Sequence, residues 1–272
     1  MDRGMTAVML VAAVAAVAPL ILIVFHVLTH GIGALSLSLL TEDPNPAGRP
    51  GGGVRNSIAG SALMVGMATA IGAPIAICCG VFLAEFGQNR WGIVLRFLVD
   101  VLAGMPSITI GLFMYSLVVL PNKHFMAIAG ALALAVILIP VVARVTEEML
   151  LLVPRGLREA AFALGAPKWR TVLTVVLPTA LPGIVTGLML ALSRIAGEAA
   201  PLLFTSLGNQ FFSLDLLQPI DALPTRIYFY ATGPFDYWHD QAWAMSLLLV
   251  TFILVVSLVV RRVAGTKVTV RQ

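Results

Sequence analysis

An arginine and a glutamate stand four positions apart in the stretch SRIAGEAAPLLFT, residues 193–205, which holds no other charged side chain. At this spacing Arg194 and Glu198 would share one face of a helix and can pair. The planar guanidinium can hold a tetrahedral oxyanion through two hydrogen bonds, and the carboxylate can accept the proton that phosphate, unlike sulfate, still carries near neutral pH. The two residues therefore predict an anion path. The alternative from the residues alone is an ion pair that locks two helices together.

The rest of the chain is apolar enough to bury these charges in a membrane. Of its 272 residues, 59% are hydrophobic and 11% are charged, whereas about 25% of the residues of soluble domains are charged. A helix needs roughly 20 apolar residues to cross the hydrocarbon core. Six runs reach this length: 5–28, 58–84, 97–120, 125–145, 181–204 and 242–260. Because continuous apolar runs exclude a β-barrel, the sequence predicts an all-α integral membrane protein, a single domain over residues 1–272 with six transmembrane helices.

The basic residues predict the orientation of these helices. Cytoplasmic segments carry an excess of Lys and Arg, and most of the 17 basic residues fall on the inner side if the N-terminus is cytoplasmic. Both termini are then expected in the cytoplasm, and the net charge of +4 needs no nucleic-acid partner. The first run is longer than the apolar region of a signal peptide, so we expect it to remain as a helix. Glu85 and Asp100 lie near the inner boundary, where solvated or paired carboxylates are expected.

The helix that carries Arg194 also carries small residues at regular spacing. An arginine at mid-membrane depth costs roughly 2.5–3.5 kcal/mol on insertion scales, so it should face protein or a water-filled path. Gly183, Gly187 and Ala191 stand four positions apart and would let another helix approach closely. We expect them to share the face of Arg194 and to form the seam with a partner subunit.

Other polar residues in the apolar runs are weaker candidates. Ser107 and Thr109 lie in AGMPSITIG, residues 103–111, where a proline and small residues permit a bend. Their hydroxyls could line the path or merely satisfy helix backbones. His26 and His30 could bind a metal, but an interfacial histidine pair is the preferred interpretation.

Several kinds of chemistry have no recognisable motif in this sequence. No lysine stands in the Gly-Lys-Ser/Thr setting of a phosphate-binding loop, and neither a Ser/His/Asp arrangement nor a Cys/His metal pattern is present. We therefore expect no catalytic site, metal or cofactor on this chain. Any ATP must be hydrolysed by another subunit.

The inner connection between the fourth and fifth runs, residues 146–180, has its own pattern. Leu157, Ala161 and Leu164 recur at helical spacing, Gly-Ala-Pro at 165–167 breaks the helix, and a second apolar stripe follows. Two short amphipathic helices at an elbow would form a docking surface for a soluble partner.

This connection resembles the EAA loop of ATP-binding-cassette importer permeases. The pattern is Glu-Ala-Ala, three residues, Gly, nine residues, an aliphatic, one residue and Leu-Pro, at Glu159, Ala160, Ala161, Gly165, Val175, Leu177 and Pro178. Valine at 175 replaces the isoleucine usual in the family. The resemblance implies that the loop inserts a coupling helix, with Glu159, Ala160, Ala161 and Gly165, into a cleft on an ATPase subunit.

Longer strings, above all RIAGEAAPLLFT, resemble the permease subunits of phosphate importers within that class. The second permease of such importers usually departs from Ala-Pro-Leu-Leu-Phe after the glutamate. The resemblance implies a type I importer permease fold in the bacterial plasma membrane, with Arg194 and Glu198 in the path of inorganic phosphate. The implied partners, besides membrane lipid, are a homologous permease, two copies of a cassette ATPase that bind ATP and magnesium, and an extracytoplasmic phosphate-binding protein.

Three other functions stay open. The chain could be a permease for another oxyanion, such as molybdate, sulfate or phosphonate. It could be an ion-coupled secondary carrier that uses Glu198 as its protonation site. It could also be a membrane scaffold, in which mutation of the charged pair would affect assembly only.

Overall fold

Helices form nearly all the regular structure of the computed structural model, which describes residues 3–266. The α-helices are α1 Arg3–Ala34, α2 Leu37–Thr41, α3 Arg55–Phe86, α4 Arg90–Gly104, α5 Ser107–Met114, α6 Leu120–Asn122, α7 Ala127–Leu151, α8 Arg155–Ala163, α9 Lys168–Thr171, α10 Leu177–Ala196, α11 Ala200–Thr205, α12 Leu223–Ala231 and α13 Asp236–Thr266. Two π-helical turns, η1 Tyr115–Val119 and η2 Val172–Val176, lie between them. Within residues 3–266 no β-strand is found, and the β pairing is limited to an isolated bridge between Pro44 and Gly52. The all-α prediction is confirmed.

The number of membrane spans agrees with the sequence. Among the described residues, five helices are long and apolar enough to cross a membrane, and a bent pair formed by α4 and the segment from α5 to α6 raises the number to six. Helices α1, α3 and α13 extend beyond the predicted runs 5–28, 58–84 and 242–260 at both ends, because helical backbone hydrogen bonding continues past the apolar residues. Since α7 continues to Leu151 and the next candidate membrane span begins at Lys168, the connection predicted at 146–180 shortens to 152–167, which contains α8. The cytoplasmic placement of the termini remains a prediction.

The third predicted helix, 97–120, is wrong as a single element. The chain enters α4 at Arg90 and leaves it at Gly104, and α5 then departs at an angle of 102°. Met105 is extended, with φ −70° and ψ 135°. A proline disfavours the helical conformation of the residue before it and lacks a backbone N–H, so Pro106 accounts for the bend.

The fifth predicted helix, 181–204, is also interrupted. Helix α10 ends at Ala196, and the short helix α11 begins at Ala200. In a continuous helix the ring of Pro201 would clash with the carbonyl of Gly197, four residues earlier. In the observed fold Pro201 lies in the first turn of α11, where its missing N–H costs nothing.

Helices α3 and α7 form the centre of the bundle, and glycine allows their close approach. A Cβ atom at Gly80 in α3 would lie 2.5 Å from the Cβ of Thr146 and 2.6 Å from the carbonyl oxygen of Ala143, both in α7. Leu134 and Leu138 of α7 are fully buried in the same core. The contact therefore requires a residue without a side chain at position 80.

Gly80→Val is expected to destabilise the purified protein by about 1–3 kcal/mol, because overpacking forces the backbones of α3 and α7 apart. Thermal unfolding in detergent measures the effect. Gly66→Val is the matched control, since a Cβ at Gly66 in the same helix meets nothing within 4 Å. Equal stability of the two variants would contradict this account of the α3–α7 contact.

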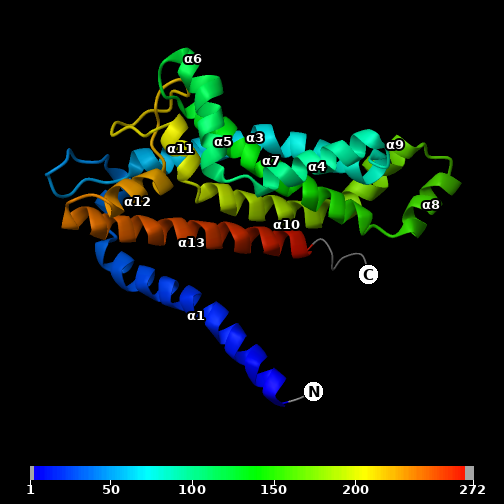
Figure 1. Ribbon diagram of the computed structural model, residues 1–272, viewed down its shortest axis with the longest axis horizontal. Coiled ribbons are helices and arrows are strands. Elements are labelled where there is room, and N and C mark those ends of the chain that lie inside the picture. The colour runs from blue at the N-terminus through cyan, green and yellow to red at the C-terminus, as the bar shows by residue number, and fades with distance from the viewer. Residues whose placement is uncertain (1–2, 267–272) are drawn as a thin grey trace.

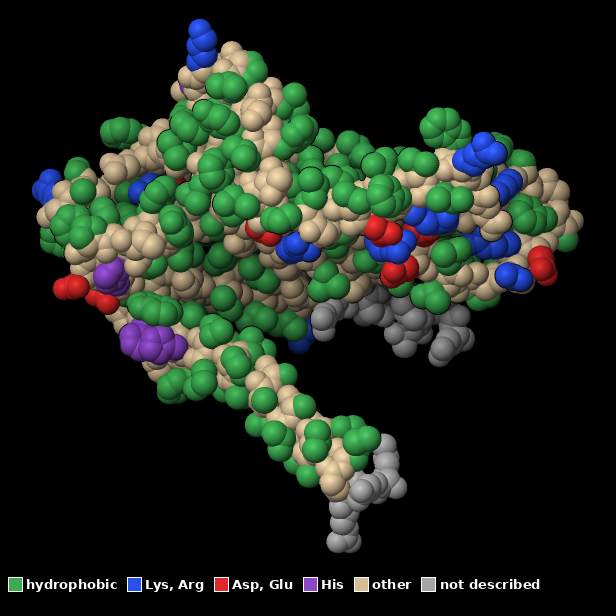
Figure 2. All heavy atoms as spheres, in the orientation of Figure 1, with side chains coloured by type: hydrophobic (Ala, Val, Ile, Leu, Met, Phe, Trp, Pro, Cys, Tyr) green, Lys and Arg blue, Asp and Glu red, His purple; other side chains and the backbone are tan. Residues whose placement is uncertain are grey.

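The bundle is elongated, and its two ends differ (Figure 1). One end carries α8 and α9 and is called the α8 end; the other carries α6, α11 and α12 and is called the α12 end. Basic side chains gather at the α8 end, while hydrophobic side chains cover much of the length between the ends (Figure 2). Helix α1 diverges from the bundle and meets α13 near its own C-terminus, where Gly31 packs on Leu247.

Candidate functional site

Arg194 and Glu198 flank the break between α10 and α11. Arg194 lies in the last turn of α10, and Glu198 follows the terminal Gly197. Their Nε and Oε1 atoms are 3.8 Å apart, so the groups form an ion pair without a direct hydrogen bond. The Arg194 side chain is 52% exposed and that of Glu198 is 19% exposed. The structure thus brings the pair together at the end of a helix, with the guanidinium accessible. The apolar run 181–204 had instead predicted a position near the middle of a helix.

The break between α4 and α5 lies beside the break between α10 and α11. Ser107 and Thr109 are on the first turn of α5, where Ser107 is half-buried and Thr109 exposed. Helix α5 packs against α11: a Cβ at Gly111 would lie 2.6 Å from the Cα of Pro201. Interrupted apolar helices are typical of transporter binding sites, because irregular backbone at membrane depth is tolerated only where it lies against protein or lines a water-filled cavity. The two breaks therefore mark one region of the fold.

The small residues of α10 admit the close approach of another helix, as predicted, but the helix that they meet is α7 of the same chain rather than one of a partner subunit. In α7, the side chain of Met149 occupies the space beside Gly183, and that of Val145 occupies the space beside Gly187. Ala191 is 1% exposed. Arg194 stands 7 and 11 positions after Gly187 and Gly183, within about 20° of each around the helix, so helix geometry keeps it near the small-residue face. Its side chain is nevertheless 52% exposed, whereas the neighbouring Ile195 is 1% exposed.

The EAA-like residues form a short helix that projects from the bundle. Glu159 and Ala160 are exposed on α8, and Ala161 is its buried residue. Gly165 follows the helix with φ +81°, a left-handed conformation that favours glycine. Exposed apolar side chains, such as Leu164 at 89% and Trp169 at 63%, surround this turn. Such a projecting apolar surface is suited to docking, and its role in ATPase coupling stays a prediction.

A family of transport proteins shares this sequence. Residues 76–266 match the family model described as "Binding-protein-dependent transport system inner membrane component". The chain belongs to this family. It is accordingly a permease subunit and a multi-pass protein of the inner membrane.

Curated relatives of this transport component extend over most of its length. The phosphate transport system permease protein PstA of Yersinia pestis is 48% identical over 249 residues, 91% of this chain and 84% of that protein. The protein of the same name from Haemophilus influenzae is 48% identical over 240 residues, covering 88% and 85%. A probable PstA of Methanocaldococcus jannaschii is 35% identical over 211 residues, covering 77% and 75%.

Solved structures of importers share the fold of this transport component. A chain of a bacterial alginate transporter, in complex with a periplasmic protein bound to an alginate pentasaccharide, superposes with a TM-score of 0.70 over 96% of this chain and 95% of that chain. Its sequence is 15% identical. An inward-facing chain of the MetNI methionine transporter gives a TM-score of 0.60 and 21% identity, covering 78% and 93%. These similarities establish the type I importer permease fold.

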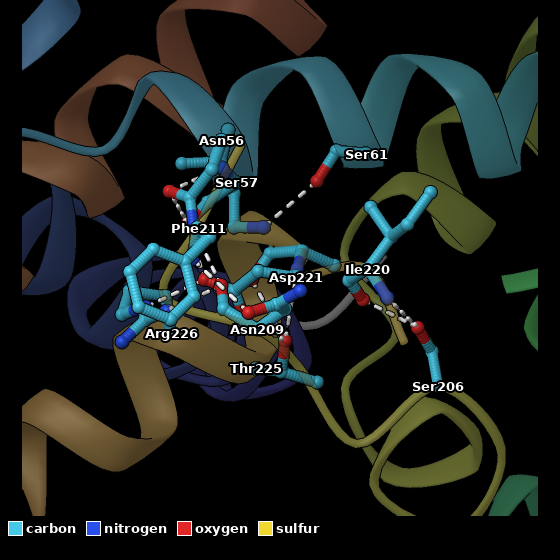
Figure 3. Close-up of polar contacts among 12 residues, drawn as sticks. Asn56, Ser57, Ser61, Ser206, Asn209, Phe211, Ile220, Asp221, Thr225 and Arg226 are labelled. Carbon is cyan, nitrogen blue, oxygen red and sulfur yellow. Dashed lines mark hydrogen bonds and ion pairs between the residues drawn. The ribbon is translucent and has the colours of Figure 1, made fainter. Parts of the chain in front are cut away.

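A buried charged cluster lies at the α12 end, and none of its residues was among the site residues predicted from the sequence (Figure 3). Arg226 of α12 donates from Nε to Oδ2 of Asp221 at 2.5 Å, and the side chains are 8% and 1% exposed. Ser57 of α3 donates to the same oxygen at 2.5 Å. Asn56 donates from Nδ2 to the backbone carbonyl of Asn209 at 2.5 Å. The cluster therefore ties the first turn of α3 to the segment that follows α11.

Asp221 has little access to water in this cluster. Burial raises the pKa of its carboxyl above the ordinary value, and the Arg226 guanidinium opposes that rise. An open pocket of about 290 Å³ lies beside the pair and is also lined by Tyr230 and Trp238. The local signal in the sequence was an Asp and an Arg five positions apart in DALPTR, within an aromatic segment.

The two histidines of α1 pack as a pair. The His26 and His30 rings are 4.0 Å apart between centroids, and both lie near Trp243 of α13. No group of three or more His, Cys, Asp or Glu side chains that could hold a metal ion is found within residues 3–266.

Proposed function

We propose that the chain is the PstA-type permease subunit of an ATP-driven importer of inorganic phosphate. The identity of 48% to phosphate permeases over 91% and 88% of the chain supports the choice of substrate. The observation that carries the proposal is Arg194, an accessible guanidinium held beside a carboxylate at a break between apolar helices. Ser107 and Thr109 follow the neighbouring break, and we propose that their hydroxyls line the same path.

The loose geometry of the pair fits an exchange of partners. An arriving phosphate would replace the 3.8 Å contact between Arg194 and Glu198 with charge-assisted hydrogen bonds of about 2.7–2.9 Å. Glu198 could accept a hydrogen bond from the proton that phosphate carries. The oxygens of sulfate carry no proton that they could donate to this carboxylate. The pair therefore favours phosphate over sulfate.

The proposal includes partner subunits. A homologous permease, PstC, would complete the path, and an extracytoplasmic binding protein, PstS, would deliver phosphate. Two copies of the ATPase PstB would bind ATP and magnesium, and this chain would hydrolyse nothing itself. The surface around Glu159, Ala160, Ala161 and Gly165 would dock on one ATPase, which is supported by the projection of α8 from the bundle and its exposed apolar side chains.

Phosphate uptake by the reconstituted complex tests the function. We expect uptake to require ATP on the ATPase side and to persist when the proton gradient is collapsed. Phosphate should compete at least about tenfold better than sulfate or molybdate, a difference of roughly 1.4 kcal/mol. Equal competition by another oxyanion would overturn the substrate assignment. Uptake that survives ATP depletion but stops without the gradient would indicate an ion-coupled carrier instead.

A further inference from the structure

Four helices meet around Glu85, one residue before the end of α3. Its carboxylate forms an ion pair with the guanidinium of Arg158 in α8 and is 6% exposed. Arg158 also donates from Nη2 to the carbonyl oxygen of Leu150 in α7 at 2.7 Å. Lys168 of α9 donates from Nζ to the backbone carbonyl of Glu85 at 2.6 Å, and the same Nζ lies 4.4 Å from the centre of the Phe86 ring. The C-terminal end of α3 is thus held by side chains from α8 and α9.

Arg158 is the main polar tie between α8 and the bundle. Of the nine residues of α8 only Ala161 is buried, so apolar packing holds this helix weakly. Glu85, in contrast, is buried and carries a charge that would be costly without its partner. A force applied to α8 would therefore reach the bundle through the guanidinium of Arg158 more than through side-chain packing.

Helix α3 connects this end to the opposite one. It is continuous over 32 residues, a length of about 48 Å. Its first turn carries Ser57, which donates to Asp221, and Asn56, which donates to the Asn209 carbonyl. The segment that contains Asn209 and Asp221 follows α11, which itself follows Glu198. Displacement of α3 along its axis would thus act on the chain that leaves the candidate anion site.

We propose that the Glu85–Arg158 ion pair transmits the movement of α8 to α3, and that it acts as a positioning pair for transport. The inference rests on the proposed ATP-driven function. It assigns to Arg158, immediately before the EAA-like residues, a role directed into the bundle, whereas Glu159 points outward and is exposed. Loss of the pair should separate ATP hydrolysis from uptake, because α8 could then move without α3.

Arg158→Ala in the complete transporter tests this in proteoliposomes, with phosphate taken up per ATP hydrolysed as the readout. We expect the ratio to fall roughly tenfold, within the range typical of coupling between sites, while ATP hydrolysis continues. Arg155→Ala is the matched control: it removes the same charge from the same helix, but Arg155 is exposed and forms no ion pair with the described residues. A ratio in Arg158→Ala equal to that of the control would overturn the proposal.

A reversible cross-link separates transmission from mere folding. Glu85→Cys and Arg158→Cys are combined in a background of Cys78→Ala and Cys79→Ala, and the two new thiols are joined by a short bifunctional methanethiosulfonate. We expect a low uptake-to-hydrolysis ratio before cross-linking, recovery after it, and loss again on reduction. An unchanged ratio through this cycle would overturn the inference. A wild-type complex that hydrolyses ATP without taking up phosphate would overturn the proposed function itself.

Discussion

Arg194→Ala is expected to reduce phosphate uptake by the assembled complex at least about thirtyfold. The change removes the proposed charge-assisted hydrogen bonds from the guanidinium to phosphate. Truncating one partner of such a hydrogen-bonded charge pair costs about 2–5 kcal/mol, and each 1.4 kcal/mol is a factor of ten. The half-exposed guanidinium favours the lower end of that range. Uptake of radiolabelled phosphate into vesicles at a fixed amount of complex measures the loss.

Assembly of the complex should survive this change, because a long and half-exposed ion pair contributes only about 0–1 kcal/mol to stability. Co-purification of the subunits checks it. Arg194→Lys keeps the charge but loses the planar fork and should recover only part of the uptake. Ser193→Ala is the neighbouring control, since its hydroxyl donates to the Met189 carbonyl of its own helix. If Arg194→Ala reduced assembly while uptake per assembled complex stayed normal, the pair would be a structural lock.

The apolar runs predicted the number of spans but not where they break. Hydropathy is averaged over a window, so it does not detect a short interruption inside a mainly apolar stretch, as at Met105 and at Gly197. A proline stands at each break and favours it: Pro106 restricts Met105, and Pro201 lacks the N–H that would continue the helix from Gly197. Prolines inside α3, α7 and α10 leave those helices continuous, so packing also decides where a break occurs. The proline at 106 indicated that the chain could bend there, whereas the apolar run predicted no interruption between 181 and 204.

The packing of α10 shows a second limit of the sequence. Its small residues at four-residue spacing predicted a close helix contact but not the helix that makes it: Gly183 and Gly187 meet side chains of α7 in the same chain. Which helix covers such a face depends on the packing of the whole chain. The spacing did correctly predict that Arg194 and Glu198 lie within reach of each other.

The buried cluster at the α12 end could not be found from local patterns. Ser57 and Asp221 are 164 positions apart and meet only because α3 passes the segment after α11. The string DALPTR shows an Asp and an Arg five positions apart but not that both side chains are buried. Long-range polar contacts of this kind depend on the packing of the whole chain.

Arg226→Ala is expected to destabilise the protein by about 3–5 kcal/mol, because it leaves Asp221 buried without a compensating charge. Unfolding of the purified chain in a denaturing detergent titration measures this loss. Without Arg226 the pKa of Asp221 should rise further, since the guanidinium opposes the effect of burial. A carboxyl whose pKa is raised in the folded state contributes to the free energy of unfolding at low pH, and this contribution is lost as the pH rises. The variant should therefore be less destabilised at about pH 5 than at about pH 7.

Arg55→Ala provides the matched control for the buried pair. Arg55 donates to Asp43 at 2.8 Å near the start of α3, but these side chains are 50% and 34% exposed, so its loss should cost only about 0–1 kcal/mol. Asp221→Asn combined with Arg226→Gln should be less destabilised than the sum of the single changes, because neither charge is then left buried alone. Equal losses in Arg226→Ala and Arg55→Ala would mean that burial does not set the strength of this cluster. The segment after α11 would then be held at the α12 end by packing instead.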